Sequence, residues 1–81
     1  MEEIMIIKIL GPGCAKCKKQ FDEAEAAVRL SGVECQIIKI EKLNDIMEYE
    51  IFMTPAVVIN EEVKASGRLV PAAEIAEWLK V

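Results

Sequence analysis

At 81 residues the chain is expected to form a single domain, residues 1–81, with a core only just large enough to stand alone. Its composition, 53% hydrophobic and 30% charged, is that of a compact globular protein and excludes a disordered chain. The net charge of −4 argues against a nucleic-acid partner, and no stretch resembles a secretory signal or a membrane span. We therefore expect a cytoplasmic protein with neither nucleic acid nor membrane as a partner.

The first half of the chain predicts a strand, a helix and a second strand. Residues 3–10 are almost continuously apolar and rich in isoleucine, which is typical of a central strand covered on both faces. After the turn Gly11-Pro12-Gly13, we expect a helix over residues 15–30 that ends near Gly32. Its apolar stripe, at spacings of four, three and four, consists of Cys17, Phe21, Ala24 and Val28. The second strand is expected over residues 34–40.

The second half predicts a short helix, a hairpin and a final helix. The short helix, over residues 43–49, is expected to turn Leu43, Ile46 and Met47 inward. Residues 55–59 and 63–66 are expected to form an antiparallel hairpin. The last helix has Pro71 at its first position. Its buried face is expected to consist of Ile75, Trp78 and Leu79.

The resulting order, β-α-β-α-β-β-α, predicts an α/β fold. A whole helix joins the first two strands, which implies that they are parallel. The closing hairpin then makes the four-stranded sheet mixed, with the three helices distributed over both of its faces.

The motif Cys14-Ala15-Lys16-Cys17 lies where the first strand and turn pass into the first helix. Two cysteines three residues apart in a first helical turn can close a disulfide. The unpaired backbone N–H groups of a helix N-terminus stabilise a thiolate, so we expect Cys14 to have a pKa below that of a free cysteine. Lys16, Lys18 and Lys19 either tune this thiol or form a solvated helix face. In a cytosolic chain such a motif is more often catalytic or metal-binding than structural.

A second informative segment is Met53-Thr54-Pro55, directly before the third predicted strand. Proline withholds a hydrogen-bond donor from a sheet, and its position makes sense if the Thr54–Pro55 bond is cis and the neighbouring backbone faces a ligand. An ordinary turn before the strand is the alternative. The CxxC motif, Thr54-Pro55 and the β-β-α ending together resemble the thioredoxin superfamily, in particular its small, glutaredoxin-sized redox-active disulfide proteins.

This resemblance covers essentially the whole chain and implies a thioredoxin fold and a protein-disulfide oxidoreductase. Cys14 would be the attacking thiol and Cys17 the resolving thiol. Thr54-Pro55 would be the cis-proline element packed against the cysteine pair, and the residue before the proline, Thr54, would pair its backbone with an extended substrate segment. Apart from the resemblance, we expect Met53 to line the substrate groove beside the cysteines. We expect the charge of Lys16 to add to the stabilisation of the Cys14 thiolate. The implied partners are protein disulfides and an electron donor of the thioredoxin-reductase type. We expect a monomer without a cofactor.

Two other function classes stay open. The thiolates of Cys14 and Cys17 are suited to Cu(I) or Zn²⁺, so the chain could be a metal-binding module or metallochaperone, although it contains no histidine and a closed zinc site needs four ligands. A non-catalytic adaptor with the same fold is the other class. The third cysteine, Cys35, alternates with Val33 and Ile37 and is interpreted as a small core residue. A role in mixed disulfides or in a dimer would require Cys35 to be exposed.

Overall fold

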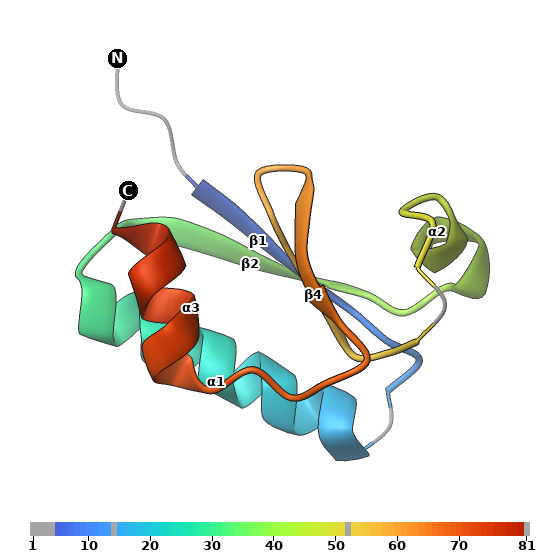
Figure 1. Cartoon of the computed structure of the whole chain (residues 1–81), viewed down its shortest axis with the longest axis horizontal. Helices are drawn as coiled ribbons and strands as arrows, with labels where there is room; N and C mark the ends of the chain where they lie inside the picture. Colours follow the sequence, from blue (N-terminus) through green and yellow to red (C-terminus); the bar gives the residue numbers. More distant parts are fainter. Residues whose placement is uncertain (1–4, 14, 52, 81) are drawn as a thin grey trace.

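The computed structural model describes residues 5–13, 15–51 and 53–80, and its elements follow the predicted order (Figure 1). Cys14 of the CxxC motif lies outside the described residues. None of the helices in the described ranges has the length and apolar character that crossing a membrane requires. The elements are β1 (Met5–Leu10), α1 (Ala15–Ser31), β2 (Cys35–Ile40), α2 (Leu43–Met47), β3 (Ala56–Ile59), β4 (Glu62–Ser66) and α3 (Ala72–Leu79).

The four strands form one mixed sheet in the order β2-β1-β3-β4. Strands β1 and β2 are parallel, with Leu10 opposite Ile40, whereas β3 is antiparallel to both β1 and β4. The β3–β4 hairpin turns at Asn60 and Glu61, whose φ angles of 49° and 68° suit the right-handed twist of the paired strands. The predicted mixed sheet, with β1 in its interior, is therefore confirmed.

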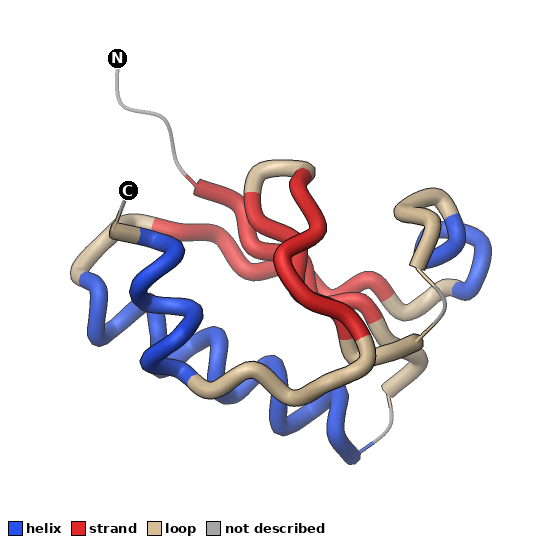
Figure 2. Tube along the Cα trace, viewed as in Figure 1, coloured by secondary structure: helices blue, strands red, loops and turns tan. Residues whose placement is uncertain are grey.

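Each face of the sheet carries its own apolar cluster. Helices α1 and α3 lie side by side on one face, where Ile7, Ile9 and Val57 of the sheet are buried (Figure 1). On the other face Leu10, Ala56 and Val58 are buried under Ile46 of α2, which lies near one end of the sheet (Figure 2). Successive side chains of β1 and β3 point to opposite faces of the sheet, and both faces are covered. The sequences of these strands are therefore almost continuously apolar.

The buried stripe of α1 differs from the predicted one at two of its four members. Cys17, Gln20, Ala24 and Ala27 are buried, whereas Phe21 and Val28 are half-buried at the flank of the core. The small side chains of Ala24 and Ala27 allow α1 to pack closely on its neighbours. Gly32 ends the helix as predicted, with φ 70° and a hydrogen bond from its N–H to the carbonyl oxygen of Val28 (3.1 Å).

The prediction for α2 was wrong at two positions. The side chains of Leu43 and Met47 are 69% and 61% exposed, and Ile46 is the buried residue of this helix. A helix of five residues makes little more than one turn, so it presents only one position to the sheet. In α3, Ile75 and Leu79 are buried as predicted, with Ala76 added, whereas Trp78 is half-buried.

Candidate functional site

Cys17 lies in the first turn of α1, at the carboxyl end of the parallel strands β1 and β2. Its side chain is only 6% exposed. The chain reaches α1 through the turn after β1, in which Gly13 has a φ of 95° that favours glycine. The predicted burial of Cys17 on the apolar stripe of the helix is therefore confirmed, and its thiol faces the protein interior.

Gly11 makes room for this thiol. A methyl group on Gly11 would lie 2.2 Å from Sγ of Cys17, a distance at which one of the two must move, and 3.0 Å from its Cβ, which is a tight contact. The N–H of Gly11 donates to the carbonyl oxygen of Ile40 at 2.9 Å, so the backbone at this point is held to the end of β2. Gly11 was read from the sequence only as part of a turn, and its contact with Cys17 was missed.

The segment before β3 reaches the same place. The Thr54–Pro55 peptide bond is cis, and Pro55 is fully buried. Thr54 is half-buried, and its Cβ lies 3.8 Å from the methyl position on Gly11 that Cys17 also adjoins. The structure thus brings Cys17 and Thr54 together around Gly11, although 36 residues lie between them in the sequence.

Met53 lies next to Thr54 on the exposed side of this site. Its side chain is 64% exposed and packs against Gly67, where a Cβ atom would lie 3.0 Å from that of Met53. The N–H of Gly67 donates to the carbonyl oxygen of Pro55 at 3.0 Å, which ties the loop after β4 to the cis segment. An exposed apolar side chain therefore adjoins the cis segment that borders Cys17.

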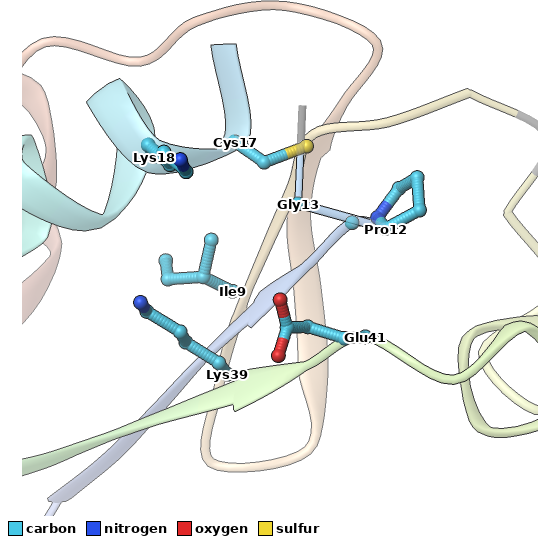
Figure 3. Close-up of a pocket in the computed structure, with 8 residues that line it drawn as sticks. Ile9, Pro12, Gly13, Cys17, Lys18, Lys39 and Glu41 are labelled. Atoms are coloured by element: carbon cyan, nitrogen blue, oxygen red, sulfur yellow. The ribbon is translucent and has the colours of Figure 1, made fainter. Parts of the chain in front are cut away.

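A cavity of about 240 Å³ opens on the other side of Cys17, between α1 and the end of β2. Lys39 and Glu41 project into it from β2 and the segment that follows, facing Lys18 on α1 (Figure 3). The Lys39 ammonium also lies over the Phe21 ring, 4.6 Å from its centroid. Lys39 and Glu41 were missed from the sequence. The signal for them is that parallel β1 and β2 end at the same edge of the sheet.

Neither Lys16 nor Cys35, the remaining predicted residues that the structure describes, lines this cavity. Lys16 is exposed on the first turn of α1. Cys35 begins β2, at the end of the sheet opposite to Cys17, where it is half-buried and packs on the core as expected. Burial raises the pKa of the Cys35 thiol. Within the described ranges no three Cys, Asp or Glu side chains gather as metal ligands, so the metal-binding alternative gains no support there.

Comparison with known proteins agrees with this arrangement. The thioredoxin domain family matches residues 5–80. The thioredoxin of Methanocaldococcus jannaschii is 32% identical over 77 residues, covering 95% of this chain and 88% of that protein. The thioredoxin of Methanothermobacter thermautotrophicus is 32% identical over 76 residues, covering 94% and 99% of the two chains.

Solved structures show the same fold at lower identity. The structure described as thioredoxin-2, a component of the malaria parasite protein secretion machinery, superposes with a TM-score of 0.72 at 16% identity, covering 99% of this chain and 84% of that one. A second malarial protein gives a TM-score of 0.71 at 15% identity, with 96% of each chain covered. From its family match, its relatives and its fold, the chain belongs to the thioredoxin superfamily and is a thioredoxin-type redox protein.

Proposed function

We propose that this protein reduces or exchanges protein disulfides through a Cys14–Cys17 dithiol/disulfide couple. The observation that carries the proposal is the position of Cys17, which is 6% exposed in the first turn of α1, against Gly11 and beside Thr54. A thiol buried to this degree is shielded from a protein disulfide in solution. It is suited to resolve a mixed disulfide that another thiol has formed, and the CxxC spacing supplies that thiol as Cys14.

The proposed reaction is two successive thiol–disulfide exchanges. The Cys14 thiolate attacks one sulfur of the substrate disulfide, whose S–S bond breaks, and the other sulfur leaves as a thiolate that takes up a proton. The Cys17 thiol then gives up its proton and attacks the Cys14 sulfur, forming the Cys14–Cys17 disulfide and releasing the second substrate thiolate. Two electrons have then passed to the substrate. An electron donor of the thioredoxin-reductase type returns the protein to its dithiol form.

We assign the substrate-binding segment to Met53, Thr54 and Pro55, because it borders Cys17 and exposes the apolar side chain of Met53; the buried Pro55 would hold the segment in place rather than contact the substrate with its side chain. Lys16, between the two cysteines in sequence, is assigned to favouring the Cys14 thiolate, and we expect the pKa of Cys14 to lie below that of a free cysteine. An iodoacetamide alkylation profile that places Cys14 at an ordinary thiol pKa would contradict this assignment. We further propose that the protein acts as a cytoplasmic monomer.

The test uses insulin as the protein disulfide. In a Cys35→Ala background, the protein is expected to accelerate insulin reduction by dithiothreitol. The Cys17→Ser variant should not show this acceleration, and when mixed with insulin in the absence of dithiothreitol it should accumulate a mixed disulfide at Cys14 that mass spectrometry identifies. Because the Cys14→Ser/Cys17→Ser variant lacks both thiols, it should form no adduct. A rate no higher than with dithiothreitol alone, without adducts, would exclude the proposal.

Elemental analysis of anaerobically purified protein addresses the metal-binding alternative. Stoichiometric zinc or copper that is lost in Cys14→Ser would favour metal carriage, because both thiolates of the motif would then be ligands. Metal-free protein that reduces insulin would support the redox function.

A further inference from the structure

Five lysines belong to the segments that meet at the end of the sheet where Cys17 lies, in a chain that is acidic overall. We define the basic rim as the exposed residues Lys16, Lys18, Lys19, Lys39 and Lys42. The first three belong to the beginning of α1, and Lys42 directly precedes α2 as its N-cap residue. Lys18 and Lys39 line the cavity beside Cys17 from opposite sides (Figure 3). Lysines that the sequence scatters over three segments therefore share one end of the molecule.

The lysines of the rim form no ion pair with a described residue, and the contact of the Lys39 ammonium with the Phe21 ring leaves its charge uncompensated. Three ion pairs join described residues: Lys8–Glu61, Lys64–Glu62 and Arg68–Glu74. Their cations all lie outside the rim, and among the described residues no rim lysine has a carboxylate oxygen within 4.0 Å. Half of the ten basic residues therefore belong to the rim, and none of them forms an ion pair with a described carboxylate, whereas three of the five others, Lys8, Lys64 and Arg68, do.

This arrangement does not favour the stability of α1. A helix N-terminus carries partial positive charge, so acidic residues stabilise it and lysines in its first turn disfavour it. The first turn of α1 contains no acidic residue. With Glu41, the carboxylate that lines the same cavity, the rim carries a charge of +4. Because the whole chain carries −4, the remainder carries −8. The separation of charge points to recognition rather than to folding.

We propose that the basic rim selects protein partners whose reactive disulfide lies in an acidic surface. This inference rests on the proposed disulfide-exchange function and names its substrate class. A positive field around the reacting thiol attracts such a surface during diffusion and raises the association rate, whereas the acidic remainder of the chain disfavours other orientations. Exposed charges of this kind affect encounter more than chemistry, so their effect falls as salt screens them.

The test compares two synthetic peptides with the same disulfide loop, flanked by glutamates in one and by lysines in the other. At low ionic strength the acidic peptide is expected to be reduced with a kcat/KM on the order of 10-fold higher, and the preference should shrink towards unity as salt is raised. The neutral disulfide of hydroxyethyl disulfide should be reduced at a rate that salt does not change.

Charge-reversal variants locate the effect. Lys18→Glu/Lys19→Glu is expected to abolish or invert the peptide preference, whereas Lys64→Glu/Lys80→Glu, with the same change in net charge outside the rim, should preserve it. Lys16 is left unchanged because of its assigned effect on Cys14. Equal reduction of both peptides at low salt, or equal effects of the two double variants, would overturn the proposal while leaving the redox function intact. Failure to reduce either peptide and hydroxyethyl disulfide would overturn both.

Discussion

The side-chain amide of Gln20 pairs with both polar backbone groups of Val70. Gln20 Nε2 donates to the Val70 carbonyl oxygen at 2.9 Å, and the Val70 N–H donates to Gln20 Oε1 at 2.7 Å. Gln20 is fully buried one turn after Cys17 on α1. Val70 ends the loop whose first residue, Gly67, packs on Met53. The pair therefore joins the helix that carries Cys17 to the loop beside the cis segment.

Replacing Gln20 by leucine should lower the free energy of unfolding by ~2–4 kcal/mol. Leucine fills similar space but leaves a buried N–H and a buried C=O of Val70 without partners, and each such group costs ~1–3 kcal/mol. Urea unfolding measures the loss. Lys19→Leu, at the exposed neighbouring position, is the control and should stay within ~0.5 kcal/mol of wild type. Equal effects of the two variants would show that the pair contributes little.

Gln20 also illustrates what the sequence can and cannot predict. The element order and the mixed sheet follow from local apolar patterns and from the connection rules for strands. The placement of Cys17 and Thr54-Pro55 likewise follows from short motifs. Gln20 was missed because its burial depends on Val70, 50 residues away, and a polar side chain interrupts an apolar pattern. The predicted burial of Leu43 and Met47 was wrong for the opposite reason: α2 is too short to bury every apolar residue that it carries.

Gly11→Ala should disturb the site through steric contact alone. The added methyl would overlap Cys17 Sγ, so we expect a loss of ~1–3 kcal/mol in stability together with slower closure of the Cys14–Cys17 disulfide. Gly32→Ala is the matched control, because a Cβ there meets no atom within 4 Å and the φ of 70° alone costs ~1–2 kcal/mol. Thermal unfolding and the rate of intramolecular oxidation measure both effects. Closure slowed equally in the two variants would refute the steric account.

Cys35 should react slowly with alkylating reagents in the folded protein. Burial raises its pKa, so a smaller fraction is thiolate at a given pH than for a free cysteine, and access is also reduced. We expect iodoacetamide to label Cys35 more slowly in native buffer than in urea at pH 8. A Cys14→Ser/Cys17→Ser variant isolates this residue for mass spectrometry. Equal labelling rates in the two conditions would mean that the thiol is exposed.

Glu50→Gly should stabilise the turn after α2. Glu50 has a φ of 56°, a left-handed conformation that costs a non-glycine residue ~1–2 kcal/mol. Part of this gain is lost because glycine makes the unfolded chain more flexible, so the expected net gain is ~0.5–1 kcal/mol. The control is Glu48→Gly, where φ is −62° and the same exchange should destabilise by a similar amount. Chemical unfolding of both variants decides the sign; loss of stability in both would contradict the expectation.

The stability contributed by Glu61 should depend on pH in a defined direction. The hydrogen bond from the Lys8 ammonium lowers the pKa of the Glu61 carboxyl below its usual 4.5, and the same bond, with one to Tyr49 Oη, raises the pKa of Lys8 above 10.5. A lowered acid pKa adds stability that is fully present above the unfolded value and is lost as pH falls through the folded value. A raised lysine pKa adds stability that is lost as pH rises through its folded value.

Glu61→Gln should therefore have a lower urea midpoint than wild type at neutral pH, and the difference should shrink below pH 4.5. Glu77→Gln, exposed on α3 without an ion pair among the described residues, controls for loss of charge alone. A difference for Glu61→Gln that persists unchanged into acid would mean that the ion pair with Lys8 does not contribute.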